Sequence, residues 1–300
     1  MSCQLLDGEK RAAEIKEELR AELQELRQKG TQPHLFAVQV GENPASRVYI
    51  RSQQKAFEEL GIPYTLKELP ADISQDDLVA QIHALNDDPQ CTGIILQMPL
   101  PEGIDTRAVQ AHISPAKDVE AITPANIGRL VFGDLTIAPC TAAAAIELYH
   151  LTGEPLKGKE VVVVGHSEIV GKPLALMLLW HPFDSATTTV CHIATRDLAF
   201  HTRRADVVFV AVGKAGLING SMLKEGAIVI DIGINRVPVV GEDGKPVLNK
   251  KGKPKMKTVG DVDFESAKEV CSWLSPVPGG VGPLTVTMLL RNTIRIAARS

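Results

Sequence analysis

The order in which short apolar segments alternate with amphipathic ones is the strongest constraint on the fold. The apolar segments have the length and composition of strands covered on both faces. The segments between them repeat apolar residues at steps of three and four, which predicts helices. Strands that alternate with helices indicate an α/β fold with a parallel sheet. In the first part of the chain we expect helices at 8–29, 46–60 and 74–85 and strands at 35–40, 63–69 and 92–97.

The same alternation begins again after a link that ends at Gly158. A further helix is expected at 283–298, and we expect it to pack on the first domain, because the loop before it leaves the second. We therefore predict two domains, 1–145 plus 283–300 and 146–282. In the second we expect strands at 159–165, 186–192, 205–212 and 226–233, with a helix at 173–180 after the first strand.

A glycine turn joins the first strand of the second domain to its helix. Strand, tight turn and helix together are typical of the opening of a dinucleotide-binding unit. The segment 165–171 departs from the usual G-x-G-x-x-G, because Ser167 stands where the second glycine is expected. Gly213 and Gly233 also fall at strand ends, where backbone passes close to a ligand. We interpret the pattern as dinucleotide binding, with ordinary turn glycines as the alternative.

The segment 276–284 holds three prolines and three glycines in nine residues and leads into the last helix. Prolines fix φ and glycines permit φ values closed to other residues, so this run specifies one shaped loop. A shaped loop before a helix N-terminus suits an anionic or polar ligand. A purely structural turn is the alternative.

Composition excludes several classes of partner. The formal net charge of −4 indicates neither a nucleic acid nor an acidic membrane surface. The five cysteines are scattered without metal-ligand spacing, so we expect no metal. No apolar stretch approaches a membrane span, and charged residues precede any apolar run at the N-terminus, so we expect a cytoplasmic protein. The lysine-rich segment 237–258 is interpreted as an exposed hairpin or loop, either simply solvated or attracting a polyanionic substrate tail.

Several distinctive motifs are spread along the chain. The longest reads Pro-Val-Pro-Gly-Gly-Val-Gly-Pro-Leu-Thr-Val at 276–286. The others lie at 43–49, 93–100, 117–119, 126–130, 139–141, 165–171 and 226–235. Together they resemble the motifs of the methylenetetrahydrofolate dehydrogenase/cyclohydrolase family, in family order across essentially the whole chain.

The resemblance implies two α/β domains flanking a cleft, an N-terminal folate domain and a Rossmann-like NAD(P)-binding domain, usually as a homodimer. It implies hydride transfer from methylenetetrahydrofolate to a nicotinamide, followed in most members by hydration of the methenyl product. The implied catalytic residues are Tyr49, Gln53 and Gln97. The implied substrate-binding residues are Glu120, Asp118, Pro278, Gly279 and Gly280. The implied cofactor-binding residues are Gly165, His166, Ser167, Ile169, Val170, Thr141, Arg196, Gly213 and Ile234.

The sequence departs from the family at Gln53, where the family has the lysine expected to transfer protons during hydration. Lys55 does not replace it, because it points to another side of the helix. Glutamine does not titrate and cannot act as a general acid or base. We therefore predict oxidation of methylenetetrahydrofolate with a weak or absent cyclohydrolase step. The alternatives are a complete bifunctional enzyme and a folate-binding or altered-substrate paralogue.

Two further features of the sequence concern the folate substrate and the nicotinamide cofactor. Glu120 and Ala121 stand where the family has Asp-Gly, which lengthens the carboxylate expected to hold the pterin. The second strand of the second domain ends without the acid that NAD-specific sites place there. His166, Thr195 and Arg196 could instead meet a 2′-phosphate. We therefore favour NADP, with NAD as the alternative.

Overall fold

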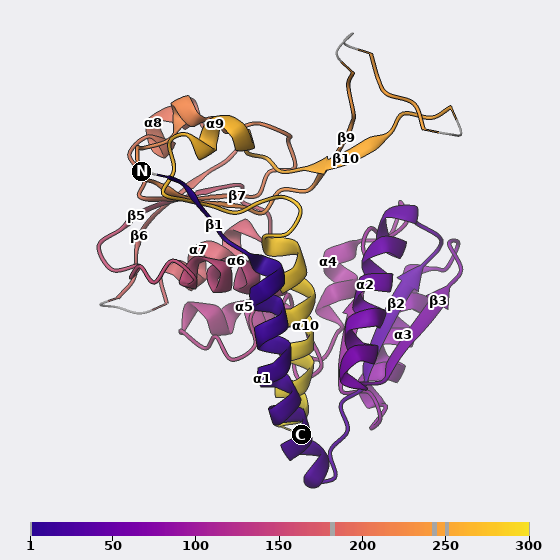
Figure 1. Ribbon diagram of the computed structural model, residues 1–300. Helices are drawn as coiled ribbons and strands as arrows, with labels where there is room; N and C mark the ends of the chain where they lie inside the picture. The colour runs from indigo at the N-terminus through magenta and orange to yellow at the C-terminus, as the bar shows by residue number, and fades with distance from the viewer. Residues whose placement is uncertain (1, 181–183, 242–244, 250–251, 300) are drawn as a thin grey trace. The chain divides into compact units, whose positions relative to one another are not determined.

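The protein forms two compact units (Figure 1). The computed structural model describes residues 2–180, 184–241, 245–249 and 252–299. One unit, Met1–Arg11 with Ala144–Leu284, is called the six-stranded unit after its main sheet. The other, Ala12–Ala143 with Thr285–Ser300, is called the three-stranded unit. Within the described ranges, no helix is long and apolar enough to cross a membrane.

The three-stranded unit is built on a parallel sheet in the order β3-β2-β4. Buried aliphatic side chains of β2 and β4 form a core with those of α3, where residues spaced for a helix supply Leu78, Ile82 and Leu85. Ser74 caps α3 by accepting the N–H of Asp77 at 3.1 Å. The elements are β2 (Leu35–Val40), α2 (Pro44–Leu60), β3 (Tyr64–Leu69), α3 (Gln75–Asp87), β4 (Gly93–Leu96), α4 (Thr106–Ala111) and α5 (Pro124–Val131).

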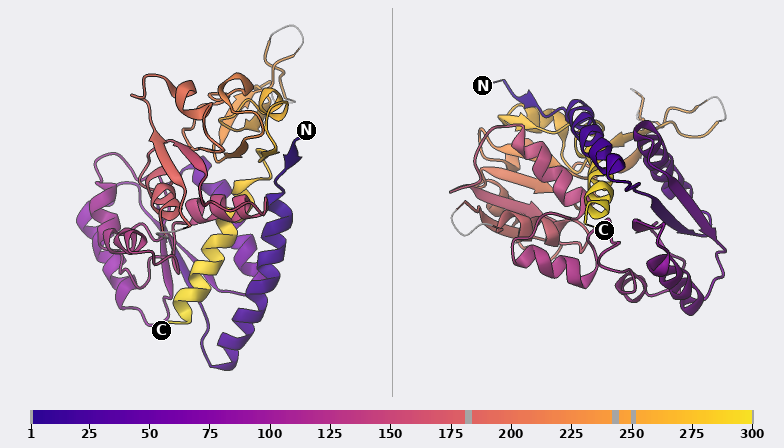
Figure 2. Two further views of the ribbon diagram at one scale, coloured as in Figure 1. Left: turned by 90° about the vertical axis from the view of Figure 1, so that its left-hand side faces the viewer. Right: turned by 90° about the horizontal axis from the view of Figure 1, so that it is seen from below.

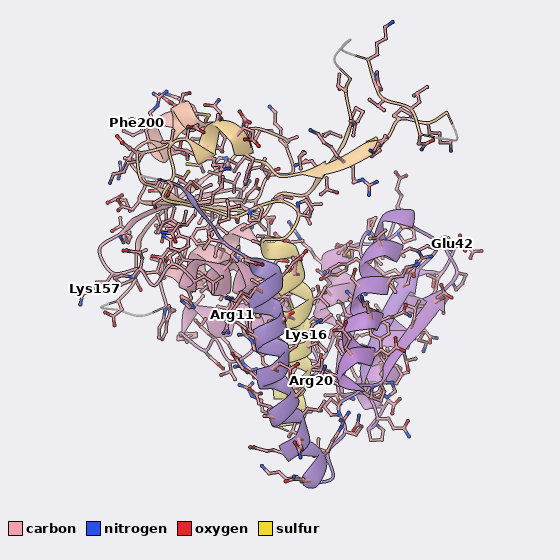
Figure 3. The ribbon with its side chains drawn as sticks, viewed as in Figure 1. Arg11, Lys16, Arg20, Glu42, Lys157 and Phe200 are labelled. Atoms are coloured by element: carbon pink, nitrogen blue, oxygen red, sulfur yellow. The ribbon has the colours of Figure 1, made fainter. Side chains whose placement is uncertain are left out.

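Two long helices complete this unit. Most of α1 (Gly8–Gln28) and of α10 (Val281–Ala297) belongs to it, and the two lie side by side in both views (Figures 1 and 2). Lys16 and Arg20 extend from α1 toward the end of α2, where both bind Glu59 (Figure 3). The polar face of α1 is thereby tied to α2.

The six-stranded unit has the order β1-β11-β8-β7-β5-β6, and its described strand pairs are all parallel. The chain leaves β5 for β6 on one side and then returns to β7 on the other, so the strand order reverses between β5 and β7. Ligands of doubly wound sheets bind beyond the carboxyl ends of strands at such a point. The elements are β1 (Gln4–Leu5), β5 (Glu160–Val164), α7 (Gly171–Leu178), β6 (Thr187–Cys191), α8 (Leu198–Thr202), β7 (Val207–Val210), η1 (Gly220–Met222), β8 (Ile228–Asp231), α9 (Phe264–Lys268) and β11 (Trp273–Leu274).

A hairpin is inserted between β8 and α9. Its strands β9 (Asn235–Pro238) and β10 (Met256–Val259) pair in antiparallel fashion. In the segment that connects them, isolated antiparallel bridges join Val240 to Pro246 and Leu248 to Pro254. The hairpin predicted for 237–258 is therefore present over the described residues. Gly244, Lys250 and Lys251 lie outside them.

The compact units differ from the predicted domains for the first residues of the chain. Gln4 and Leu5 form β1, which pairs with β11 through the register Gln4↔Trp273 and Leu5↔Leu274. These backbone hydrogen bonds place residues 1–11 in the six-stranded unit. A strand of two residues has too few side chains to show a period of two, so its sequence carries no strand pattern.

Candidate functional site

Three polar side chains of the three-stranded unit meet at the Gln53 amide. Gln53 is fully buried on α2, and its Oε1 accepts hydrogen bonds from Gln97 Nε2 and Tyr64 Oη, each at 2.8 Å. Gln97 is 4% exposed just beyond β4, and Tyr64 is the first residue of β3. Gln53 Nε2 has no hydrogen-bond partner among the described residues. The sequence had predicted Gln53 and Gln97 for this site but had not pointed to Tyr64.

Tyr49 lies one helical turn before Gln53 on α2 and is half-buried. Burial, and then the proximity of Cys140 and Glu120, raise the Tyr49 pKa far above its ordinary value, while Gln53 acts in the opposite direction. The hydroxyl therefore keeps its proton throughout the physiological range. Lys55 is exposed, as expected for a residue on another side of the helix.

Glu120 and Asp118 follow one another on the same connection but have different environments. Asp118 is buried, and its Oδ2 accepts from the Thr123 N–H at 2.8 Å and from Asn126 Nδ2 at 2.9 Å. Asp118 thus fixes the loop that leads into α5. Glu120 is half-buried, and burial together with the charge of Asp118 raises the pKa of its carboxyl to about 8. Ala121 has φ 54°, in the left-handed region where the family's glycine would be unstrained.

Asn292 of α10 fixes the backbone on both sides of this site. Its Nδ2 donates to the carbonyl oxygens of Val119 and Ala138, each at 2.8 Å, and lies 3.6 Å from Cys140 Sγ. Burial, Glu120 and Asp118 raise the pKa of the Cys140 thiol well above its usual range, so Cys140 is not a thiolate here. The sequence analysis missed Asn292, although a polar residue inside an apolar helix is a usable sign of such a contact.

The loop that contains Pro278, Gly279 and Gly280 belongs to the six-stranded unit. The Gly8 N–H donates to the Gly279 oxygen at 2.9 Å, and a Cβ on Gly8 would lie 1.8 Å from the Gly280 oxygen. Gly279 has φ +105°, which favours glycine. The loop is therefore held in one shape against the start of α1, and its role toward a substrate stays a prediction.

The glycine turn at 165–171, predicted to bind a dinucleotide, has the tight geometry that its glycines suggested. Gly165 follows β5 with φ +119°, and a Cβ there would lie 2.2 Å from the Ala211 oxygen beyond β7. A Cβ on Gly171 would lie 2.1 Å from the Gly165 oxygen. Ser167 Oγ accepts the N–H groups of Val170 and Gly171 at 3.2 and 3.5 Å. The turn is therefore packed tightly between β5 and β7, and the approach of a pyrophosphate to it stays a prediction.

The end of β6 carries groups that suit a phosphate. The rings of His166 and His192 lie 4.7 Å apart between centroids, and both residues are exposed. Thr195 Oγ1 accepts the His192 N–H at 2.9 Å, which shapes the turn that exposes Arg196. Asp197 is occupied in capping α8. Positive and polar groups thus stand where an NAD-specific site would hold an acid.

The remaining predicted cofactor residues fall in four places. Gly213 lies beyond β7 with φ +77° and open space around its Cα, and Ile234 is 66% exposed beyond β8. Ile169 is exposed and Val170 half-buried at the start of α7. Thr141 lies in the three-stranded unit, at the start of α6 (Cys140–His150). None of these positions is shown to contact a cofactor, so the assignments stay predictions.

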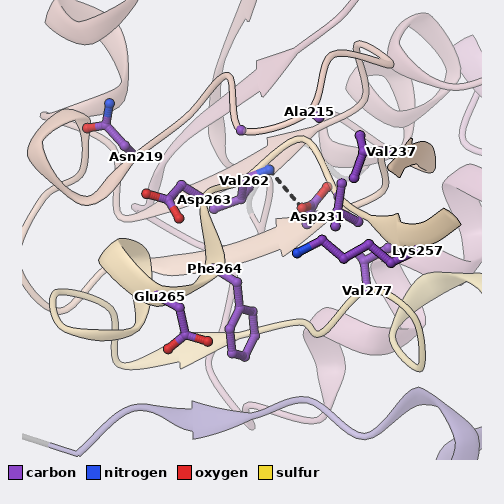
Figure 4. Close-up of a pocket in the computed structure, with 13 residues that line it drawn as sticks. Ala215, Asn219, Asp231, Val237, Lys257, Val262, Asp263, Phe264, Glu265 and Val277 are labelled. Carbon is purple, nitrogen blue, oxygen red and sulfur yellow. Dashed lines mark hydrogen bonds between the residues drawn. The ribbon is translucent and has the colours of Figure 1, made fainter. Parts of the chain in front are cut away.

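Two buried carboxylates that the sequence analysis did not identify join the strand ends of the six-stranded unit. Asp231 accepts N–H groups of Gly233, Asp261 and Val262 at 2.9–3.0 Å, and burial raises its pKa to about 6. Figure 4 shows Asp231 and Lys257 at a cavity of about 520 Å³. Asp261 accepts, at 2.6–2.8 Å, from Val212 N, Gly213 N and Asn235 Nδ2. The pair therefore sets the backbone around Gly213 and Gly233.

Comparison with known proteins also divides the chain into a catalytic part and an NAD(P)-binding part. Residues 6–120 match the family model of the tetrahydrofolate dehydrogenase/cyclohydrolase catalytic domain, and residues 139–300 match that of its NAD(P)-binding domain. Bifunctional protein FolD of Moorella thermoacetica is 48% identical over 299 residues, covering 100% of both chains. The FolD of Halalkalibacterium halodurans is also 48% identical, over 297 residues and 99% of both chains.

Solved structures resemble the whole chain as well. The bifunctional methylenetetrahydrofolate dehydrogenase/cyclohydrolase FolD of Campylobacter jejuni superposes with a TM-score of 0.90 at 42% identity, covering 99% of each chain. The Trypanosoma brucei enzyme, complexed with NADP and an inhibitor, gives 0.89 at 37% identity, covering 100% of this chain and 98% of its own. The predicted α/β architecture with a Rossmann-like domain is confirmed.

Proposed function

Because the chain belongs to the tetrahydrofolate dehydrogenase/cyclohydrolase family, we propose that it oxidises 5,10-methylenetetrahydrofolate to the methenyl derivative with NADP, with a weak or absent cyclohydrolase step. Gln53 is the observation that carries this proposal. It is buried and neutral, and its hydrogen-bond partners Tyr64 and Gln97 carry no positive charge. Hydration of the methenyl product needs a group that moves protons, and an amide cannot do so.

A neutral residue at this position suits the oxidation itself. Loss of a hydride leaves a positive charge on the one-carbon unit, and an ammonium about 4 Å away would oppose it by about 4 kcal/mol at an effective dielectric constant of 20. The Gln53 amide imposes no such repulsion. Tyr49, whose raised pKa keeps its hydroxyl protonated, can donate a hydrogen bond but is a poor base for activating water.

Glu120 is the residue we assign to the pterin. Two adjacent N–H donors of a pterin edge match the two oxygens of a carboxylate. With a pKa raised to about 8, the Glu120 carboxyl is largely protonated at neutral pH before substrate binds, and the approaching donors favour its ionised form. Asp118 keeps the connection that carries Glu120 in place through its bonds to Thr123 and Asn126.

The residues of the six-stranded unit fit a dinucleotide. A bound NADP would supply the hydride acceptor. Gly165 forms the tight turn between β5 and α7, and the positive end of the α7 dipole suits a pyrophosphate beside it. His166 and Arg196, both exposed, would meet a 2′-phosphate, and the absence of an acid in line at the end of β6 supports NADP over NAD.

Arg196→Ala is expected to raise the KM for NADP about tenfold, because one charge-assisted contact to phosphate is lost. The KM for NAD, which lacks that phosphate, should change less than about twofold. Initial rates with the two cofactors measure both values, and NAD serves as the internal control. Equal changes for both cofactors would contradict the assignment of Arg196.

The proposed function is tested by two rates measured side by side on the unmodified protein. Methenyltetrahydrofolate formation from the methylene derivative should be readily measured with NADP. Enzymatic hydrolysis of added methenyltetrahydrofolate should be at least about 100-fold slower, as expected when a general acid–base group is missing. Hydrolysis at a rate comparable to oxidation would overturn the proposal.

A complete bifunctional dehydrogenase/cyclohydrolase is the second candidate. It is favoured by the relatives at 48% identity, which are named bifunctional proteins. In that case water or another residue would take over the proton transfer, and the two rates above would be similar. A homodimer formed through the nucleotide-binding domains and a cytoplasmic location stay predictions from the resemblance and the composition; sedimentation velocity would test the first.

A further inference from the structure

Tyr64 occupies a position that decides how the Gln53 amide is oriented. A carbonyl oxygen offers two acceptor sites, and Tyr64 Oη and Gln97 Nε2 fill both sites of Gln53 Oε1 at 2.8 Å. The Tyr64 ring is itself fixed, because it packs edge-on against Phe57 with centroids 5.6 Å apart. Burial raises the pKa of the Tyr64 hydroxyl, so it remains a donor at physiological pH.

Because both acceptor sites of Gln53 Oε1 are filled, the amide nitrogen of Gln53 points away from Tyr64 and Gln97. It lies in a fully buried side chain and has no hydrogen-bond partner among the described residues. The Tyr49 hydroxyl lies against this amide, because a side-chain hydrogen bond with Gln53 lowers the Tyr49 pKa against the larger effect of burial. Nε2 still has no partner at ordinary hydrogen-bond geometry among the described residues. A buried donor left open beside Tyr49 is expected to be completed by a ligand atom that accepts a hydrogen bond.

We propose that Tyr64 is a positioning residue that holds the Gln53 nitrogen toward the substrate and makes the site incompatible with a lysine at position 53. This inference rests on the proposed function, since it assumes that the one-carbon unit of the folate reacts beside Tyr49 and Gln53.

The incompatibility with lysine has a steric and a polar cause. Lysine is one atom longer than glutamine, and because position 53 is fully buried, the extra atom must displace a neighbour such as the Tyr64 hydroxyl. Lysine also has no acceptor, so the Tyr64 proton would lose its partner. The ammonium would then compete for the hydroxyl oxygen instead of reaching the substrate. Removing the hydroxyl relieves both problems together.

Tyr64→Phe, Gln53→Lys and the double variant test this proposal. Tyr64→Phe should lower the dehydrogenase kcat about tenfold while the KM for the folate changes less than twofold, because the amide loses its orientation but the pterin contacts remain. Gln53→Lys alone should gain less methenyltetrahydrofolate hydrolysis than the double variant, which should exceed Gln53→Lys at least about tenfold.

Tyr149→Phe is the matched control, because it removes a hydroxyl that donates to the Pro155 oxygen at 3.2 Å in the six-stranded unit. A merely structural role of Tyr64 would lower the melting temperature in both Phe variants and leave kcat unchanged in both. The Kd for NADP should be unchanged in Tyr64→Phe, which confirms an intact fold.

The outcomes separate this inference from the proposed function. Fast hydrolysis by the unmodified protein overturns the proposed function, whatever the variants do. Slow hydrolysis by the unmodified protein, with Gln53→Lys as active as the double variant, overturns only the role of Tyr64. An unchanged kcat in Tyr64→Phe, or no gain in the double variant, overturns it as well.

Discussion

Gly165→Ala is expected to destabilise the protein by about 4 kcal/mol or more and to weaken NADP binding at least about 100-fold. The added Cβ would lie 2.2 Å from the Ala211 oxygen, so the ends of β5 and β7 would have to separate. Gly165 also has φ +119°, a conformation that alanine adopts only with strain. Both effects act at the point where the pyrophosphate is expected to approach.

Gly213→Ala is the matched control for this experiment. Gly213 lies at the end of the neighbouring strand β7 with φ +77°, but nothing lies within 4 Å of an added Cβ. Only backbone strain remains, which costs about 1–2 kcal/mol. Urea denaturation followed by circular dichroism gives the two free energies of unfolding, and fluorescence titration gives the Kd for NADP. Equal losses in the two variants would show that the approach to Ala211 is not what requires glycine.

The comparison of these two glycines shows what the sequence could and could not predict. Strand, glycine turn and helix in succession identified the nucleotide-binding unit, because hydrophobic period and turn residues are local properties. Which glycine is sterically required depends on Ala211, which follows a strand far along the chain. The carboxylate pair of Asp231 and Asp261 was missed for the same reason, since only the folded backbone brings its N–H donors together.

The candidate substrate site shows the same limit. Gln53, Gln97 and Glu120 could be singled out from motifs and from polar residues in apolar surroundings. The partners that orient them come from elements that are remote in sequence. Tyr64 begins β3 and Asn292 lies in α10. Asn292 stands out as a polar residue in an apolar helix, but the sequence does not show which atoms either residue contacts. The two-residue strand β1 was missed because pairing with β11, and not its own pattern, makes it a strand.

Glu120→Gln is expected to stabilise the protein at pH 8 by about 2 kcal/mol while weakening folate binding roughly 10- to 100-fold. The pKa of Glu120 is raised to about 8 from an ordinary value of 4.5, first by burial and then by Asp118. The folded state therefore holds a proton that the unfolded state has released, and the free energy of unfolding falls as the pH rises from about 4.5 to about 8. The full shift would correspond to about 5 kcal/mol, which we reduce because Glu120 is only half-buried.

Comparing the free energies of unfolding of the unmodified protein and of Glu120→Gln isolates the titration of this carboxyl from that of other groups. Asp231, with a pKa of about 6, also lowers stability as the pH rises, but it does so equally in both proteins. Urea denaturation at pH 5 and pH 8 should give nearly equal free energies of unfolding at pH 5 and a more stable variant at pH 8. A constant difference between the proteins at both pH values would mean that the Glu120 pKa is not raised.

A stable variant with unchanged folate affinity would show that another group holds the pterin. The expected combination, greater stability with weaker binding, would mean that the chain keeps an unfavourable carboxyl because the substrate needs its charge.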